Sequence, residues 1–393
     1  MQNYNNSNGK NSNLILILLI VLISLVLIVA VTGIVYMLKN PAGGPDAPQT
    51  DPITDPITDP VTDPVTDPVT EPLIDANGVE FTTETVLSNT LHQGDIILVN
   101  KDYAYDFEAN SAVQKTVTEL YPIWKSYALY NYKLLNSSLF TTTRGAELIN
   151  PLFDAFLLET AADLGVDVNN TAAVNKQGIN DYMLTSFYRD YAEQEQTMAD
   201  SIEKYGSESA ALRYCAPAGH SEHHTGLAFD VKVFTDDEKS YALGEAKMPE
   251  IYNWIFENCA KYGFIQRYQA GKEAKTGYSE ETWHFRYVGV PHSHIIAANN
   301  FCLEEYIDYI KGYSYDNYLT YDNGEHTYAI YYAEVDFVSE IIPEVKDANG
   351  NIITPSSVVE VMASETNLPV PANFPYEISG NNVDGFIITV TLK

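Results

Sequence analysis

The chain has 393 residues, which is enough for one sizeable domain with appendages or for two modest domains. A composition that is 45% hydrophobic and 19% charged excludes a chain that is disordered throughout. Aspartate and glutamate outnumber lysine and arginine by 53 to 22, and the resulting net charge of -31 argues against a nucleic-acid partner, which would need a basic face.

Residues 14–38 contain no charge and almost no polar side chain. As a helix, these 25 residues would span about 37 Å, more than the roughly 30 Å hydrocarbon core of a bilayer. A cleavable signal peptide has a shorter apolar region followed by small residues, and this pattern is missing. We expect residues 1–13 to be a short cytoplasmic tail and residues 14–38 to be an uncleaved, single-pass transmembrane signal anchor. A buried globular helix is the alternative.

Residues 39–74 form a linker with a four-residue repeat that begins Asp51-Pro52-Ile53-Thr54 and continues as D-P-x-T units. A proline in every repeat blocks helix and favours an extended, polyproline-like chain. At roughly 3.1 Å per residue, such a linker reaches on the order of 100 Å. We interpret it as a spacer that holds a domain away from a membrane.

Residues 75–311 carry the expected globular domain, and their apolar periodicity predicts both helices and strands. Helices are expected at 114–131, 145–165, 249–262 and 294–311, and strands at 182–188, 227–233 and 283–288. Residues 312–393 are rich in β-forming residues, with hairpin signals at Asn323-Gly324 and Asn349-Gly350. The predicted fold class is therefore α+β with a β-rich C-terminal segment.

Five of the eight histidines lie in two short segments, residues 220–224 and 284–292. A catalytic zinc ion needs three protein ligands, commonly imidazoles and a carboxylate, and an open position for water. His223, Asp230 and His284 can supply this set. On its predicted strand, Asp230 faces away from Leu227 and Phe229, so the carboxylate can face a cleft while its neighbours pack.

Hydrolysis also needs a base close to the metal and a cation close to the scissile carbonyl. Glu281 lies three residues before His284 and is placed to take a proton from the attacking water. Arg189, at the end of a predicted strand, can stabilise charge on the carbonyl oxygen. The alternatives are that the His223 to Asp230 spacing arose by chance and that Arg189 is a partner in a structural salt bridge.

Three ordered motifs give the chain a resemblance to a known family. The segment S-x-H-x-x-G-x-A-x-D from Ser221, followed by E-x-W-H-x-R-Y from Glu281, resembles the zinc D-Ala-D-Ala carboxypeptidases of the VanY type. The segment 186–191 with Gln194 is similar to that family's S-G-Y-R-S-Y-x-x-Q motif, and 262–272 is also similar. The resemblance covers about residues 170–290.

The resemblance implies a small antiparallel sheet with flanking helices that carries a zinc cleft. It implies that the ligands of Zn²⁺ are His223, Asp230 and His284, that Glu281 is the base and that Arg189 steadies the carbonyl. Within the same motifs, the substrate-binding candidates are Ser221, Gln194, Tyr188 and Trp283.

The chain departs from the family's motifs at a few positions. Phe187, Asp190 and Thr282 stand where the family usually has glycine, serine and proline. His220 and His224 are additional histidines, which we expect to be solvated loop residues rather than groups that tune substrate fit. The cysteines are too few for a disulfide scaffold, and we expect Cys215 and Cys259 to be buried thiols rather than a disulfide.

The resemblance implies that the chain removes the terminal D-alanine from peptidoglycan stem peptides, its partner outside the membrane. The domain would then be extracytoplasmic and held at the cell membrane by the N-terminal helix. An L,D-carboxypeptidase or an endopeptidase of the same fold remains an alternative. A non-catalytic zinc module that binds wall peptides is a further alternative, although such a module has no need for Glu281 or Arg189. A purely structural zinc would need His224 as a fourth ligand.

Overall fold

The computed structural model describes residues 75, 77–120, 133–134, 139–234, 240–245, 248–346 and 352–393. The described residues all belong to one compact unit, Thr70–Lys393. The predicted anchor at 14–38 and the linker at 39–74 lie outside the described residues. Among the residues that are described, no helix is both long and apolar enough to cross a bilayer. The expected mixture of helices and sheets with a β-rich C-terminal part is confirmed.

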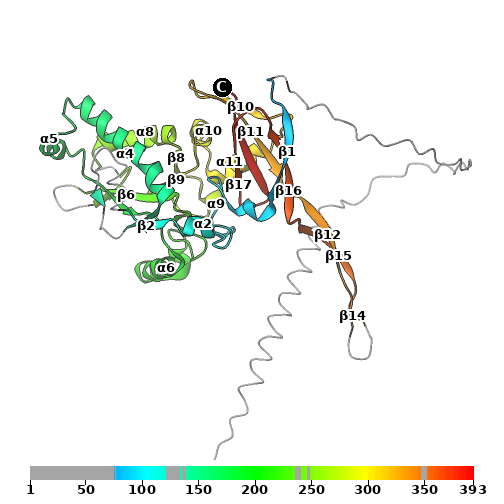
Figure 1. Cartoon of the computed structure of the whole chain (residues 1–393). Coiled ribbons are helices and arrows are strands. Elements are labelled where there is room, and N and C mark those ends of the chain that lie inside the picture. Colours follow the sequence, from blue (N-terminus) through cyan, green and yellow to red (C-terminus); the bar gives the residue numbers. More distant parts are fainter. Residues whose placement is uncertain are drawn as a thin grey trace, which may run out of the picture. The chain divides into compact units, whose positions relative to one another are not determined.

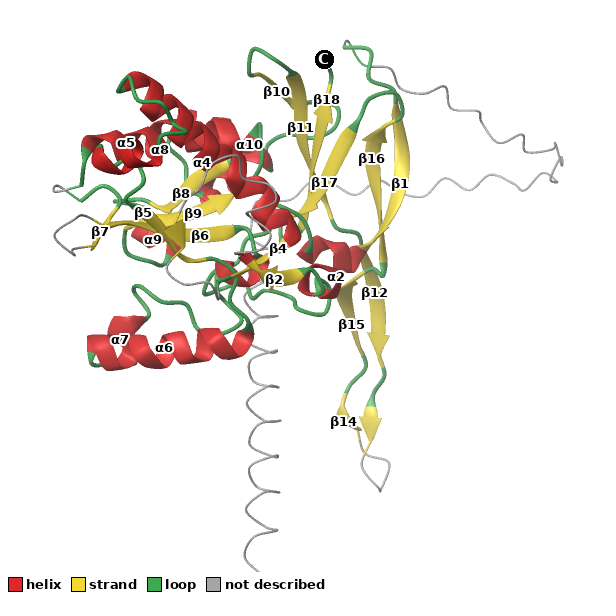
Figure 2. Ribbon diagram, turned by 60° about the vertical axis from the view of Figure 1, so that its left-hand side comes forward, coloured by secondary structure: helices red, strands yellow, loops and turns green. Residues whose placement is uncertain are grey.

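A six-stranded sheet forms the centre of the unit's N-terminal part (Figures 1 and 2). Its strands run in the order β3-β5-β6-β9-β8, and β7 pairs with β6. Their bounds are Lys133–Leu134 (β3), Tyr182–Ser186 (β5), Ala228–Phe234 (β6), Glu281–Tyr287 (β9), Phe264–Tyr268 (β8) and Ser240–Ala242 (β7). The predicted strands at 182–188, 227–233 and 283–288 are thus confirmed. The antiparallel expectation is wrong only at the edge, where β3 and β5 pair in parallel.

Two of the strand pairs in this sheet change register next to each other in space. Between β8 and β9, Gln266 pairs with Phe285 and Tyr268 pairs with Glu281, so β9 advances four residues while β8 advances two. Between β5 and β6 the register also shifts, just before the pair formed by Ser186 and Asp230. Such irregularities re-aim side chains that strict alternation would place on one face.

Helix α4 (Thr143–Asp163) supplies the largest part of the core on one face of this sheet. It confirms the helix predicted at 145–165, and the Thr142 side chain caps its N-terminus by accepting a hydrogen bond from the Gly145 amide. Phe153 of α4 stacks on Tyr182 of β5 with a ring-centroid distance of 4.9 Å. The apolar face of the sheet is therefore sealed, and the polar side chains of β6 and β9 are left on the other face.

The remaining helices are short except for α6, which has 15 residues. They are α2 (Ser111–Gln114), α5 (Thr171–Lys176), α6 (Tyr191–Tyr205), α7 (Glu208–Ala211), α8 (Asn253–Asn258), α9 (Glu273–Thr276), α10 (His292–Asn299) and α11 (Leu303–Ile310).

Three helix predictions need correction. The helix predicted at 114–131 is wrong at Val117–Glu119, which is strand β2 and pairs with β4 (Phe140–Thr142), and residues 121–131 of this prediction lie outside the described residues. The helix at 249–262 is α8 with a 3₁₀ segment on each side. The helix at 294–311 is two helices, because Asn300 adopts a left-handed conformation with φ of 52° and ends α10.

The C-terminal part is built from strands, one of which pairs with the first strand of the unit. A four-stranded sheet has the order β10-β11-β18-β17, with bounds Leu319–Asp322, Thr327–Glu334, Gly385–Thr391 and Tyr376–Gly380. The hairpin predicted at Asn323-Gly324 is confirmed between β10 and β11, whereas 349–350 lies outside the described residues. Strand β1 (Phe81–Leu87) pairs with β16 (Glu365–Pro371). The first strand of the unit therefore forms a sheet with a strand from near its C-terminal end.

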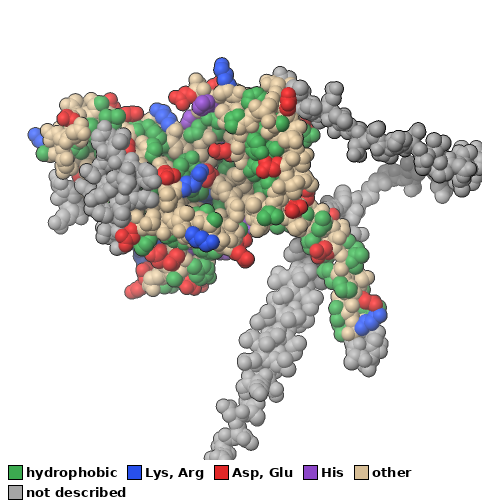
Figure 3. Space-filling view, viewed as in Figure 1, with side chains coloured by type: hydrophobic (Ala, Val, Ile, Leu, Met, Phe, Trp, Pro, Cys, Tyr) green, Lys and Arg blue, Asp and Glu red, His purple; other side chains and the backbone are tan. Residues whose placement is uncertain are grey.

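A two-stranded ribbon projects from this part (Figure 1). It comprises β12 (Phe337–Ile342) with β15 (Ser357–Met362), and β13 (Val345–Lys346) with β14 (Ile352–Thr354). Figure 3 shows hydrophobic side chains along it, and acidic side chains that outnumber basic ones on the visible face of the molecule.

Candidate active site

Three side chains with metal-binding chemistry meet on the polar face of the six-stranded sheet. His223 comes from the 3₁₀ helix η2 (Glu222–Thr225), Asp230 from β6 and His284 from β9. Their ligand atoms all lie within 4.8 Å of one another. Asp230 and His284 are direct partners on neighbouring strands, so the sheet register itself sets their separation.

Each imidazole is oriented by an oxygen on the side away from Asp230. His223 donates from Nδ1 to the Phe187 carbonyl at 2.5 Å, and its Nε2 lies 3.4 Å from the carboxylate of Asp230. His284 donates from Nε2 to the carboxylate of Glu222 at 3.3 Å, and its Nδ1 lies 3.0 Å from Asp230. Metal-binding histidines are held in this way by a carbonyl or a carboxylate. Two nitrogens and one oxygen converge here, and no fourth ligand joins them from the residues that the structure describes, which fits a catalytic zinc ion.

The electrostatics of the three groups agree with this chemistry. Burial lowers the pKa of His223 to about 4, so the ring is neutral, as a ligand must be. Burial alone would raise the pKa of Asp230, but the two imidazoles hold it below its usual range. Burial would lower the pKa of His284, but hydrogen bonds to Asp230 and Glu222 raise it to about 9, so this ring carries a proton at neutral pH that a bound metal ion would displace. The cluster therefore attracts positive charge to the space between the imidazoles and the Asp230 carboxylate.

A cavity of about 150 Å³ opens onto these donors. It is also lined by four of the residues predicted from the motifs, Arg189, Ser221, Glu281 and Trp283. Glu281 is only 6% exposed, and burial raises its pKa to about 8. A carboxyl group with such a pKa can both accept and release a proton near neutral pH. Trp283, which alternation would turn away from His284, shares the cavity because β9 is irregular there.

Arg189 is held in place by neutral oxygen atoms. Its Nε donates to the Gln194 side-chain oxygen at 2.8 Å, and one terminal nitrogen donates to the Ser186 hydroxyl at 2.7 Å. Within the described ranges, no carboxylate forms a salt bridge with this guanidinium. Its positive charge is therefore available to the cavity that it lines.

Two predicted substrate-binding residues lie outside this cavity. Gln194 is fully buried, accepts from Arg189 and donates to the Ala216 carbonyl at 2.7 Å, so it positions the guanidinium. The Tyr188 hydroxyl donates to Gln114, and its ring borders a neighbouring cavity of about 720 Å³ that Arg189 also lines. Ser221 does line the catalytic cavity, and its hydroxyl accepts from the His223 amide at 3.3 Å.

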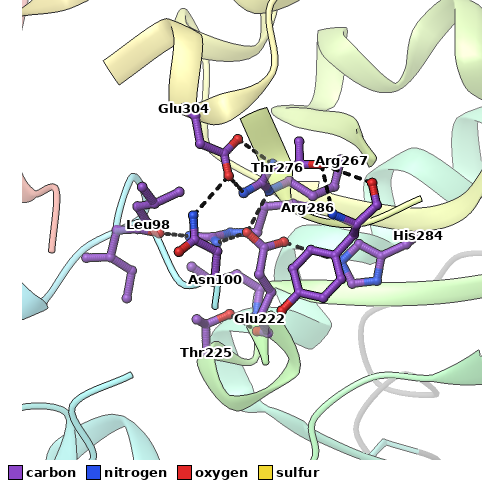
Figure 4. Close-up of polar contacts among 12 residues, drawn as sticks. Leu98, Asn100, Glu222, Thr225, Arg267, Thr276, His284, Arg286 and Glu304 are labelled. Carbon is purple, nitrogen blue, oxygen red and sulfur yellow. Dashed lines mark hydrogen bonds and ion pairs between the residues drawn. The ribbon is translucent and has the colours of Figure 1, made fainter. Parts of the chain in front are cut away.

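Glu222 is a residue of the site that the sequence analysis missed. It is buried, and one of its oxygens accepts from Arg267 at 2.8 Å and from Arg286 at 2.9 Å, while the other faces His284 (Figure 4). Burial would raise its pKa, but the two guanidinium groups hold the pKa well below the usual range. Arg267 also forms a bidentate pair with Glu304 of α11, at 2.7 and 2.8 Å. The available signal was a pair of arginines, Arg267 and Arg286, each within a strand and followed by a tyrosine, since a buried guanidinium needs a carboxylate partner.

The expectation of a solvated loop histidine is wrong for His224, which is buried. Its Nδ1 donates to the Arg189 carbonyl at 2.7 Å, and its Nε2 accepts from the Gly219 amide at 3.0 Å. Both ring nitrogens are occupied, so His224 supplies no fourth metal ligand. Gly226, which ends the turn, has φ of 68°, and a Cβ there would lie 2.4 Å from Thr142. A side chain at this position would displace the turn that carries His223.

All three cysteines are free and buried. The expectation of buried thiols at Cys215 and Cys259 is therefore confirmed. Cys215 lines the catalytic cavity, and burial raises the pKa of its thiol. It is thus a neutral wall of the site and not a nucleophile.

The three donors, with Glu281 and Arg189 beside them, fit a metal-dependent peptidase, and comparison with known proteins gives the family. The model of the VanY family, described as D-alanyl-D-alanine carboxypeptidase, matches residues 167–290. A D-alanyl-D-alanine carboxypeptidase of Enterococcus faecium is 31% identical over 308 residues, which is 78% of each chain. The chain therefore belongs to the VanY-type D-alanyl-D-alanine carboxypeptidases.

Two further relatives widen the range of activities in the family. The bifunctional D-Ala-D-Ala dipeptidase and carboxypeptidase VanXYC of Enterococcus gallinarum is 36% identical over 130 residues, 33% of this chain and 68% of the relative. The solved structure of the vancomycin-resistance D,D-dipeptidase VanXYg, in complex with a D-Ala-D-Ala phosphinate analogue, has a TM-score of 0.56 and 27% identity. That match covers 79% of this chain and 99% of VanXYg.

Proposed function

We propose that this protein is a zinc-dependent carboxypeptidase that removes the terminal D-alanine from peptidoglycan stem peptides outside the membrane. The observation that carries this proposal is the meeting of His223, Asp230 and His284 in one cavity with Glu281 and Arg189. The substrate class follows from the relatives, which are D-alanyl-D-alanine carboxypeptidases and dipeptidases.

His223 through Nε2, His284 through Nδ1 and Asp230 through a carboxylate oxygen would hold the zinc ion. The ion supplies Lewis acidity for water activation and for polarisation of the carbonyl. Glu281 accepts a proton from the attacking water on its carboxylate and returns it to the leaving amine. Arg189 places its guanidinium against the carbonyl oxygen as negative charge develops there.

The alternatives within the fold are an L,D-carboxypeptidase and an endopeptidase, which need the same machinery. A binding module without catalysis is disfavoured, since Glu281 and Arg189 both line the cavity although binding alone would need neither.

The test incubates the zinc-loaded full-length chain with three wall fragments and identifies the products by mass. The fragments are a stem pentapeptide, a stem tetrapeptide and a cross-linked dimer. Loss of one D-alanine from the pentapeptide alone supports the proposal, whereas cleavage of the tetrapeptide or of the cross-link supports the corresponding alternative. If zinc binds in stoichiometric amount and no fragment is cleaved, the protein is not the proposed enzyme. His284→Ala is the control that should lose zinc and activity together.

A further inference from the structure

Tyr278 lines the catalytic cavity, and the mechanism above does not use it. It lies three residues before Glu281 and is only 4% exposed. Its hydroxyl oxygen is buried and has no hydrogen-bond partner in the part of the chain that the structure describes. Among the described side chains that share this property, Tyr278 alone borders the catalytic cavity.

The surrounding turn holds Tyr278 in place. The Thr276 hydroxyl accepts from the Tyr278 amide at 3.3 Å and donates to the Tyr278 carbonyl at 3.2 Å. Gly277 between them has φ of 81°, and a Cβ there would lie 2.8 Å from the side chain of Lys101. The phenol ring packs against Tyr268 with a centroid distance of 5.0 Å, and Tyr268 packs at the same distance against His284. The hydroxyl is thus fixed before any substrate arrives.

A buried hydroxyl without a partner destabilises a folded protein, and groups of this kind call for a functional explanation. Two neighbouring side chains that line the same cavity have partners within the protein: Ser221 accepts from the His223 amide, and Glu222 binds two arginines. The Tyr278 hydroxyl has no such partner, so a ligand that enters the cavity can supply one.

We propose that the hydroxyl of Tyr278 contacts the substrate and donates a hydrogen bond to an oxygen of the bound peptide. This inference rests on the proposed function, which supplies a peptide as the occupant of the cavity. Burial raises the pKa of Tyr278, so the hydroxyl keeps its proton and can donate it. Peptide carbonyls and the terminal carboxylate offer oxygen acceptors, which a phenol can bind without adding charge beside Glu281.

The substitution Tyr278→Phe removes the hydroxyl and keeps the ring. We expect kcat/KM for a peptide ending in D-Ala-D-Ala to fall about tenfold or more, because the substrate oxygen loses its donor. The thermal midpoint should stay the same or rise, because an unsatisfied hydroxyl has been removed from the protein interior. Zinc content should remain stoichiometric, since Tyr278 is not a metal ligand.

Tyr252→Phe is the matched control. Tyr252 is also a buried tyrosine, but its hydroxyl donates to the Gly178 carbonyl at 2.5 Å and accepts from the Asp181 amide at 2.9 Å. It does not line the catalytic cavity. This variant should show the opposite pattern, with a lower thermal midpoint and kcat/KM within twofold of the unsubstituted chain.

Binding measurements separate this inference from the proposed function. In the Glu281→Gln background, calorimetry should show peptide affinity about tenfold weaker when Tyr278→Phe is added. Unchanged kcat/KM together with unchanged affinity would overturn the inference. If the unsubstituted chain binds peptides but cleaves none, the proposed function fails while the affinity comparison still decides the role of Tyr278.

An ester analogue tests the direction of the hydrogen bond. A substrate with an ester in place of the scissile amide keeps the carbonyl oxygen and lacks the N–H. Equal losses on the ester and the amide, caused by Tyr278→Phe, support donation by the hydroxyl. A loss confined to the amide would overturn it, because the hydroxyl would then be accepting from the substrate N–H.

Discussion

Glu281 is the residue on which hydrolysis should depend most directly. Glu281→Gln keeps the size and hydrogen bonding of the side chain but cannot accept a proton. We expect zinc and peptide binding to persist, while kcat falls by about two to four orders of magnitude. Turnover and zinc content measured on the same preparation test this. Normal turnover would show that another group is the base.

Arg189 should act through its planar guanidinium and not through charge alone. Gln194 and Ser186 hold two of its nitrogens, and a lysine could not reproduce that fork. We expect Arg189→Ala to lower kcat about a hundredfold or more, and Arg189→Lys to recover only part of that loss. Thermal midpoints distinguish this from a structural role, in which both variants would melt earlier and whatever remained folded would turn over normally.

The candidate catalytic and metal-binding residues could be predicted where they lie in a strand pattern or in a motif. Asp230 and His284 are polar residues within predicted strands, and the alternation of side chains along each strand predicts the sheet face on which they lie. Glu222 was not assigned and His224 was wrongly expected to be solvated, because the arginines that bind Glu222 and the Arg189 carbonyl that binds His224 come from other segments of the chain. A buried carboxylate and a solvated one look alike in sequence when Arg267 and Arg286 lie 45 and 64 residues further on.

At the level of elements, hydrophobic periodicity predicted where the long helices and the central strands lie better than it predicted where each element begins and ends. Apolar spacing placed α4 and the three central strands correctly. The same spacing misread β2, since a three-residue strand is too short to show alternation. It also merged α10 with α11, because Asn300 in a left-handed conformation leaves no clear mark in hydrophobic periodicity. The irregular register of β9, which brings Trp283 to the cavity, has no counterpart in the sequence pattern.

The pair between Arg267 of β8 and Glu304 of α11 should be a large contributor to stability. Arg267 is fully buried, and Glu304→Gln would leave its charge only partly compensated. We expect the free energy of unfolding to fall by about 2–3 kcal/mol, measured by denaturant titration. The comparison is Lys311→Gln, which removes a more exposed pair with Asp384 and should cost at most about 1 kcal/mol. Equal losses would mean that burial does not govern these pairs.

At the scale of the whole molecule, the two ends of the described chain are joined. Strand β1 lies within the predicted carboxypeptidase segment 75–311, and its partner β16 lies within 312–393. Arg286 of β9 also donates to the carbonyls of Asp95 and Ile97, which ties the segment after β1 to the catalytic sheet. The C-terminal strands thus complete the unit that contains the active site.

The proposed membrane topology is open to a direct test. If residues 14–38 anchor the chain and the catalytic unit lies outside, protease treatment of intact cells should release that unit by cutting within residues 41–74. Such an extended linker is accessible to proteases, whereas a packed domain resists them. Mass spectrometry of the released fragment locates the cut, and lysed cells serve as the control. Complete protection in intact cells, with cleavage only after lysis, would place the unit inside.

The direct pairing of Asp230 with His284 across β6 and β9 affects what happens to copies of the chain that fold with a shifted strand register. A slip of one residue would turn Asp230 towards the interior and Phe229 towards water, because side chains alternate along a strand. The error that dismantles the metal ligands would then also expose the core. A misassembled copy would therefore be open to proteases, and few stable but inactive molecules should accumulate.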